Sequence, residues 1–155
     1  MKARTAKVME IPEEEKRLDK QLCFAVYATA HAFTRAYKPI LDKVGLTYPQ
    51  YLVMLVLWEK AELPVKTIGE QLDLDSGTLS PLLKRLEQNG LIKRTRDSRD
   101  ERQVLVSLTP KGDAMRGEVD TIMGSIGEAI GCTLEEMTEI RKLLEGLRSN
   151  LNGAA

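Results

Sequence analysis

The sequence predicts a mainly α-helical protein with one small β-hairpin. Along most of its 155 residues, apolar side chains recur at steps of three and four, which is the spacing of helices that bury one face. Two β-prone runs, residues 92–95 and 104–108, enclose the charged segment RDSRDER, which is typical of a hairpin with an exposed tip. Because two short helical stretches directly precede the hairpin, we expect residues 65–112 to form one compact module.

Two helices are expected before this module. Residues 1 to about 12 show no apolar pattern and are expected to fray, and a long helix should begin at Glu13. Pro39 should kink or restart this helix, because proline has no N–H to donate. Thr47 is the expected N-cap of a second helix, Gln50 to Lys60, which is apolar on nearly all sides and should therefore be buried. The stripe of the long helix, which should end at Gly45, comprises Leu22, Val26, Ala30, Phe33, Tyr37, Leu41 and Val44.

The module itself contains two short helices and a hairpin. The first helix, of about two turns, has an apolar side formed by Ile68, Leu72 and Leu74. Residues 75–78 supply a turn and an N-cap, since short polar side chains accept from the free N–H groups at a helix start. The second helix ends at Asn89-Gly90, and its apolar face is formed by Leu79, Leu82, Leu83 and Leu86. Helix, turn, helix and charged hairpin in this order predict a winged helix-turn-helix.

The free face of the second helix is polar. Hydroxyls and cations of this kind suit base edges and phosphates in a DNA major groove. The candidate DNA-binding residues on this helix are Ser76, Thr78, Ser80, Lys84 and Arg85, and those on the hairpin are Arg94, Arg96, Asp97 and Arg99. Arg99 could enter a neighbouring minor groove, where narrow A·T tracts attract arginine. Any one of these features alone is usual for a solvated surface, but their ordered combination favours double-stranded DNA as the partner.

Composition limits the other function classes. The chain is 43% hydrophobic and 30% charged with no net charge, so DNA binding has to come from local clustering. Residues 84–102 hold seven cations and four anions, a net charge of +3. No apolar run approaches the roughly 20 residues that span a bilayer, and no signal-peptide pattern is present, so we expect a cytoplasmic protein without membrane contact. No metal-ligand spacing occurs, the single histidine, His31, is expected to be structural, and no cofactor is expected.

The C-terminal part predicts two more helices. Thr109 should cap the first, with Pro110 in its first turn, and Gly131-Cys132 interrupts the pattern. Thr133 opens a capping box for the last helix. One small winged helix cannot cover all these apolar stripes, so we expect a homodimer that sets two recognition helices on successive turns of DNA; packing into a monomer is the alternative. The expected division is residues 13–45 and 110–152 for a helical dimerisation region and 46–109 for the DNA-binding domain.

Cys23 is the candidate reactive residue of the first helix. A cysteine there is by default a small buried hydrophobe. However, all four tyrosines fall within 28 residues of it, and phenol hydroxyls can donate to a thiolate and lower the thiol pKa. Tyr37 lies 14 residues away, roughly 21 Å along a continuous helix, so the two side chains could meet only across two subunits.

The chain resembles MarR-family repressors over about residues 15–150. The residues that carry this resemblance are LTYPQY (46–51), DSGTLSPLLKRLE (75–87), DSRDER (97–102) and LTPKG (108–112). The segment LDKQLCFAVYATAHAFTRAYKPIL (18–41) is similar to the organic hydroperoxide-sensing members of that family. The resemblance implies that Cys23 is the peroxide-reactive thiol, that Tyr37 and Tyr48 are its hydrogen-bond partners, and that Asp97 and Arg99 shape and insert the wing.

The resemblance leaves the fate of oxidised Cys23 open. Some members of the group resolve the sulfenic acid with a second cysteine, and Cys132 lies in the matching region. Others capture a low-molecular-weight thiol. We favour a disulfide between Cys23 and Cys132 of the partner subunit, which would release the reduced dimer from an inverted-repeat operator when an organic hydroperoxide acts as inducer.

Two other functions remain open from the sequence. The first is a MarR-like repressor that releases DNA when a small aromatic ligand enters the dimer cleft, with Cys23 inert. The second is a thiol peroxidase with Cys23 as the peroxidatic residue and Cys132 as the resolving residue. Nothing in the sequence resembles a peroxidase fold, so we expect a regulator and not an enzyme.

Overall fold

The computed structural model describes residues 10–154. The expectation that residues 1 to about 12 fray therefore falls mostly outside the described residues. The chain divides into two compact units, Met1–Ala36 and Tyr37–Ala155.

The first unit begins with two single 3-10 turns, η1 (Glu13–Lys16) and η2 (Leu18–Lys20), and continues into the helix α1 (Leu22–Leu41). The prediction that the helix begins at Glu13 is wrong, because α1 begins at Leu22. The backbone is extended at Arg17 and at Gln21, and these residues separate the two 3-10 turns from each other and from α1. Of the two outcomes expected at Pro39, a kink or a restart, the restart does not occur, since α1 continues through the proline to Leu41.

The second unit contains the last turn of α1 and everything after it. A 3-10 turn, η3 (Asp42–Val44), follows α1 and ends at Gly45, whose φ of 72° favours glycine. The helix α2 (Tyr48–Glu59) starts with the expected cap at Thr47, which forms a capping box with Gln50. Seven of its twelve residues are buried, as its uniformly apolar sequence predicts.

A winged helix-turn-helix follows α2, as the sequence predicts. Its elements are β1 (Glu62–Pro64), α3 (Val65–Leu72), α4 (Ser76–Gln88), β2 (Ile92–Arg96) and β3 (Val104–Leu108). The sheet is antiparallel with the order β1-β3-β2, and β3 pairs with β2 from Ile92↔Leu108 to Arg96↔Val104. The expected two-stranded hairpin is thus incomplete, because β1 adds a third strand through pairs such as Glu62↔Ser107.

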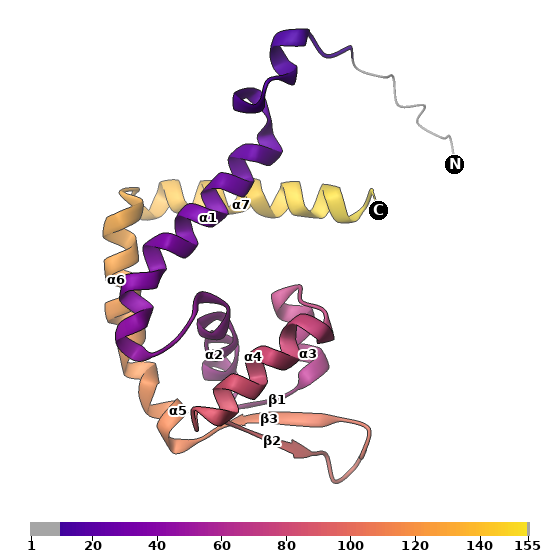
Figure 1. Cartoon of the computed structure of the whole chain (residues 1–155), viewed down its shortest axis with the longest axis vertical. Coiled ribbons are helices and arrows are strands. Elements are labelled where there is room, and N and C mark those ends of the chain that lie inside the picture. Colours follow the sequence, from indigo (N-terminus) through magenta and orange to yellow (C-terminus); the bar gives the residue numbers. More distant parts are fainter. Residues whose placement is uncertain (1–9, 155) are drawn as a thin grey trace. The chain divides into compact units, whose positions relative to one another are not determined.

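The core of the second unit lies between the helices and this sheet. Figure 1 shows α2, α3 and α4 gathered on one side of the three strands. The side chains that are almost fully buried there are Leu41, Tyr51, Val53, Met54, Leu57, Ile68, Leu79, Leu83, Leu86, Ile92 and Val106. Three of the four leucines expected on the inner face of α4 are among them, so the opposite face of α4 is left free.

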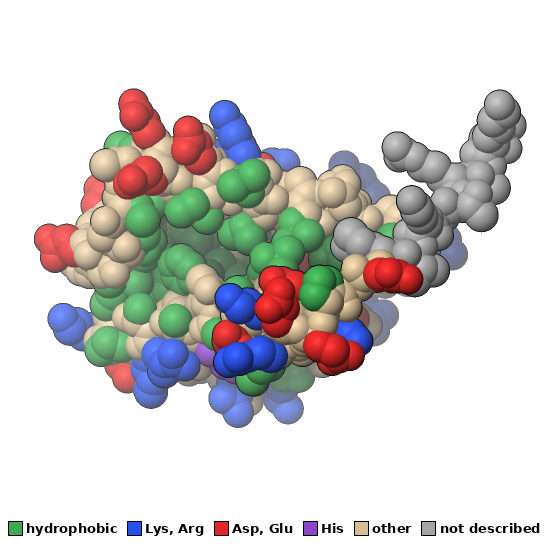
Figure 2. All heavy atoms as spheres, turned by 90° about the horizontal axis from the view of Figure 1, so that it is seen from above, with side chains coloured by type: hydrophobic (Ala, Val, Ile, Leu, Met, Phe, Trp, Pro, Cys, Tyr) green, Lys and Arg blue, Asp and Glu red, His purple; other side chains and the backbone are tan. Residues whose placement is uncertain are grey.

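The C-terminal part consists of α5 (Pro110–Ala114), the 3-10 segment η4 (Met115–Glu118), α6 (Val119–Ile130) and α7 (Leu134–Asn152). The single helix expected between Thr109 and Ile130 is therefore interrupted by η4. The helix α7 has no buried residue, and Leu134 and Leu143 are 80% and 75% exposed. Figure 2 shows hydrophobic side chains at the surface between the charged ones.

Within residues 10–154, no single helix has both the length and the apolarity to cross a membrane. One bent pair of helices, Leu22–Val44 with Tyr48–Glu59, passes that test by length and composition, and the second helix of the pair is the buried α2.

Candidate DNA interface and thiol site

The start of α4 is fixed by a side-chain cap. Asp75 accepts hydrogen bonds from the Thr78 amide over 2.8 Å and from the Thr78 hydroxyl over 2.9 Å. The amide contact, followed by the hydroxyl contact, lowers the pKa of Asp75 below its ordinary value, so the cap is ionised at neutral pH. The candidate DNA-binding residues of α4, all of them exposed, are Ser76, Thr78, Ser80, Lys84 and Arg85.

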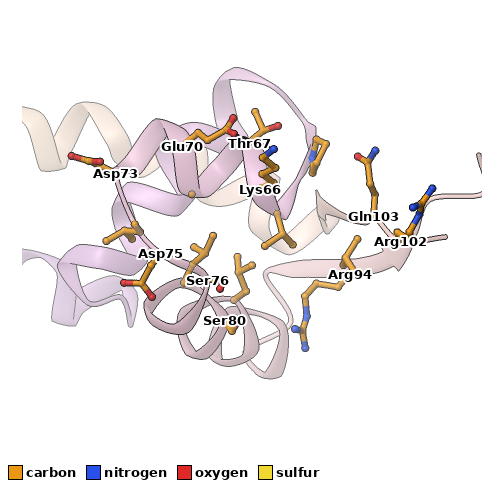
Figure 3. A pocket seen from close by; sticks show the side chains of 17 residues that line it. Lys66, Thr67, Glu70, Asp73, Asp75, Ser76, Ser80, Arg94, Arg102 and Gln103 are labelled. Atoms are coloured by element: carbon orange, nitrogen blue, oxygen red, sulfur yellow. Dashed lines mark ion pairs between the residues drawn. The ribbon is translucent and has the colours of Figure 1, made fainter. Parts of the chain in front are cut away.

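A groove of about 890 Å³ separates α3, the first half of α4 and the strands of the wing. Of the predicted DNA-binding residues, Ser76, Ser80 and Arg94 line it, and the rest lie outside its lining. Figure 3 shows Ser76 and Ser80 on the same helix, and it shows Arg94 extending from its strand away from Lys66 and Glu70. Lys66 and Gln103 also line the groove, and the sequence did not single them out.

The carboxylate of Asp97 holds the loop at the wing tip. Asp97 is buried, its Oδ1 accepts the Arg99 amide N–H over 2.8 Å, and the Arg99 Nε lies 3.6 Å from the same oxygen. The Asp97 amide in turn donates to the Gln103 carbonyl over 3.0 Å. The Arg99 side chain is 88% exposed, so a buried aspartate holds the loop while the arginine remains accessible to solvent.

Arg94 differs from the other predicted DNA-binding cations because its guanidinium donates hydrogen bonds to a carboxylate. Its Nη2 and Nε donate to one oxygen of Glu87 over 2.7 and 3.0 Å, and its amide donates to the other oxygen over 3.1 Å. These hydrogen bonds from Arg94 lower the pKa of Glu87. The pair joins the last turn of α4 to β2, the first strand of the hairpin.

The C-terminal end of α4 is tied to the start of α5. The carbonyls of Asn89, Gly90 and Leu91 accept from Lys111 Nζ (2.9 Å), the Thr109 hydroxyl (2.6 Å) and the Thr109 amide (3.1 Å). These bonds satisfy carbonyls that a helix end leaves without partners, and the lysine cation suits the negative end of the helix dipole.

Three tyrosines form a cluster on the second unit. The Tyr37 ring lies 4.6 Å from that of Tyr48 and 5.7 Å from that of Tyr51, measured between ring centroids. Burial, and then the neighbouring Tyr48 and Tyr51, raise the pKa of Tyr37 to about 12. Burial also raises the pKa of Tyr48 and of Tyr51. The phenols therefore stay protonated at neutral pH and can donate hydrogen bonds. The structure brings the predicted pair Tyr37 and Tyr48 together and adds the buried Tyr51.

The two cysteines lie in different units. Cys23 is on the exposed surface of α1, in the first unit, where the aromatic neighbours are Phe24, Tyr27 and His31; the Tyr27 and His31 rings are 4.4 Å apart. Cys132 is half-buried between α6 and α7, and its thiol donates to the Ile130 carbonyl over 3.7 Å. Both thiols are free in the single chain.

These features define the class. A capped recognition helix with an exposed polar face, followed by a wing that carries an exposed arginine at its tip, is a winged-helix DNA-binding module. The expected class is thereby confirmed by the fold.

Known proteins identify the family. The family model of the transcriptional regulator SarA/Rot matches residues 35–119. The chain belongs to this family of transcriptional regulators, whose DNA-binding domain is a MarR-like winged helix. It is 52% identical to the HTH-type transcriptional regulator TtmR of Methylorubrum extorquens, over 92% of this chain and 73% of that one. It is 47% identical to the organic hydroperoxide resistance transcriptional regulator of Bacillus subtilis, over 90% of this chain and 92% of that one.

Solved structures agree with this assignment. The structure of reduced AbfR bound to DNA is 38% identical to this chain, covers 92% of it and 98% of its own length, and has a TM-score of 0.76. AbfR is a protein of Staphylococcus epidermidis, and its disulfide-formed structure has a TM-score of 0.61 to this chain. The predicted resemblance to organic hydroperoxide-sensing regulators is thus confirmed.

Proposed function

We propose that the protein is a transcriptional repressor which binds an inverted-repeat operator as a reduced homodimer and is released when an organic hydroperoxide oxidises Cys23. The observation that carries this proposal is the exposed Cys23 thiol on a winged-helix regulator that is 47% identical to an organic hydroperoxide resistance regulator. As a member of a family of transcriptional regulators, it acts through DNA and not through catalytic turnover.

The DNA contacts follow from exposure. The free face of α4 enters the major groove with Ser76, Thr78, Ser80, Lys84 and Arg85, and the wing follows the backbone with Arg96. Arg99 reaches into the minor groove, supported by Asp97, which holds the loop below it. The structure of reduced AbfR bound to DNA, with its similar fold, supports this arrangement.

Dimerisation is supported by the apolar side chains that a single chain leaves in contact with water. On α7 these include Leu134, Ile140, Leu143, Leu144 and Leu151, which are all exposed. Contiguous exposed apolar surface is typical of an interface, and a symmetric interface on this helix would bury the same side chains of both subunits.

The chemistry of the switch begins at the Cys23 thiolate. Its sulfur attacks one peroxide oxygen, so that an S–O bond forms and the O–O bond breaks. The alkoxide leaves and takes a proton to become an alcohol, and Cys23 is oxidised to a sulfenic acid. Hydroxyls of Tyr37 and Tyr48, which burial keeps protonated, would donate to the thiolate and stabilise it in the reduced dimer.

A second thiol then completes the oxidation. The Cys132 thiol of the partner subunit attacks the Cys23 sulfur, an S–S bond forms, and the hydroxyl leaves as water. A low-molecular-weight thiol would react in the same way if Cys132 were too distant. A structure of disulfide-formed AbfR, which is 39% identical to this chain, supports a disulfide state. Reduction by two further thiols restores Cys23 and DNA binding.

The proposal is tested by gel shift on a duplex that the reduced protein selects from a randomised pool. Wild type, Cys23→Ser and Cys132→Ser are each examined with and without cumene hydroperoxide. We expect wild type to release DNA on oxidation and Cys23→Ser to stay bound. If both stay bound, or if a phenolic compound without oxidant releases both, the redox switch is wrong. Non-reducing gels of Cys132→Ser separate the disulfide route from capture of an external thiol.

A further inference from the structure

The ion pair between Glu87 and Arg94 joins two elements that the proposed function sets on different grooves of DNA. Glu87 belongs to the last turn of α4, and Arg94 is the middle residue of β2. Arg94 gives this one carboxylate three hydrogen bonds, from Nη2, Nε and the backbone amide. A two-nitrogen fork with an additional amide fixes direction as well as distance, which a single contact would not do.

The strand side of this contact is itself anchored. Arg94 pairs with Val106 of β3, which is fully buried in the core. The helix side is anchored by Leu86, which precedes Glu87 and is also fully buried. The pair therefore connects two backbone segments that are each anchored in the core.

The negative charge of Glu87 is unexpected at a surface that binds DNA. An anion at the end of a recognition helix repels phosphates, so electrostatics alone would favour its removal. Glu87 also neutralises Arg94, which reduces the number of free cations near the DNA. Both side chains are about one third exposed, 36% and 34%, so the pair contributes little to global stability.

We propose that Glu87 and Arg94 are positioning residues that hold the wing at the angle which delivers Arg99 to the minor groove, and that neither contacts DNA. This assignment rests on the proposed DNA binding, and it changes the role of Arg94 from a candidate DNA contact to a support. It also adds Glu87 to the residues on which DNA affinity depends.

The test uses full-length reduced protein and a fluorescent duplex that wild type selects from a randomised pool. Dissociation constants are measured by anisotropy for Glu87→Gln, for Arg94→Gln and for both together. The three substitutions are repeated in an Arg99→Ala background. Glu70→Gln is the matched control, because Glu70 is an exposed anion of the same module whose nearest cation, Lys66, lies 3.8 Å away. Circular dichroism establishes that each variant is folded.

We expect Glu87→Gln to weaken DNA binding by roughly tenfold although it removes an anion, because charge-assisted hydrogen bonds that orient the wing are lost. Arg94→Gln should weaken binding by the same factor, and the double variant should be no weaker than either. In the Arg99→Ala background, each substitution should change the dissociation constant by less than about twofold, because the tip that the pair positions is gone. Glu70→Gln should leave binding unchanged or tighter.

Several results would overturn the assignment. The first is a Glu87→Gln variant that binds DNA as tightly as wild type or more tightly, because the only effect of the Glu87 charge would then be to repel phosphates. If Arg94→Gln lost as much DNA affinity in the Arg99→Ala background as it does alone, Arg94 would be a direct DNA contact. If wild type selects no duplex at all, the proposed function fails together with this inference, whereas wild-type binding with an unaffected Glu87→Gln variant overturns the inference alone.

Discussion

The indole Nε1 of Trp58 donates a hydrogen bond to the carbonyl oxygen of Gly112 over 2.9 Å. This bond connects the buried helix α2 to the start of α5. On its other side, Gly112 lies against the Leu91 carbonyl, so closely that an added Cβ would come within 2.0 Å of that oxygen. The junction thus joins α2, the end of α4 and the C-terminal helices at one glycine.

We predict that Gly112→Ala destabilises the protein by about 3 kcal/mol, because the clash falls on a backbone atom that cannot move independently. The Leu91 carbonyl is itself held by the Thr109 amide. Urea denaturation followed by circular dichroism measures the free energy of unfolding. Gly124→Ala is the control, since Gly124 lies inside α6 with nothing within 4 Å of an added Cβ, and it should be neutral or slightly stabilising. Equal stability of the two variants would show that the Leu91 contact is not tight.

Trp58→Phe should cost about 1 to 3 kcal/mol, because it leaves the Gly112 carbonyl without its buried donor and removes part of a buried ring. Thermal and urea unfolding measure the loss. Wild-type stability in this variant would indicate that water or another donor replaces the indole.

We expect the folded protein to lose stability in alkali because the buried phenol of Tyr37 ionises there. Burial and its tyrosine neighbours raise its pKa from 10.0 to about 12. Because the folded state holds the phenol proton more tightly than the unfolded state, the contribution of the protonated phenol to folding stability is fully present below pH 10. It is lost as the pH rises to about 12. In Tyr37→Phe, the free energy of unfolding should therefore fall less steeply over that interval. Ultraviolet titration of tyrosinate should also lose its most alkaline step, and an unchanged titration would contradict the assignment of that step to Tyr37.

Arg99→Ala should weaken DNA binding and lower the slope of log K against log salt by about 0.9, because a cation held in the minor groove displaces about one counterion. Its guanidinium is 88% exposed, so the folding stability should hardly change. Anisotropy titrations at several salt concentrations give the slope. An unchanged affinity would contradict the placement of Arg99 in the minor groove.

Local patterns in the sequence predicted the helices and the wing. Caps at Thr47, Asp75, Thr109 and Thr133 fall where short polar side chains precede apolar stripes, because capping depends on neighbours a few residues away. The charged hairpin tip was equally evident, since alternating apolar residues on both sides of it indicate paired strands.

Features that depend on distant partners were not predictable in this way. The strand β1 has three residues and ends in a proline, so only its pairing with β3 makes it a strand. The Glu87–Arg94 pair was missed for the same reason, because the turn between α4 and β2 decides which side chains meet. The start of α1 was placed too early because Glu13 to Lys20 contains good helix formers, whereas the structure has two 3-10 turns there.

The most direct test of the redox switch is a hydroperoxide titration of the DNA-bound, reduced protein, followed by anisotropy of the labelled DNA. If Cys23 is the trigger, wild type should leave the DNA with an end point near one equivalent of cumene hydroperoxide per subunit, and dithiothreitol should restore binding. Cys23→Ser should remain bound throughout the same titration. Release of Cys23→Ser at the same equivalents, or retention of wild type beyond a large excess of oxidant, would contradict the account.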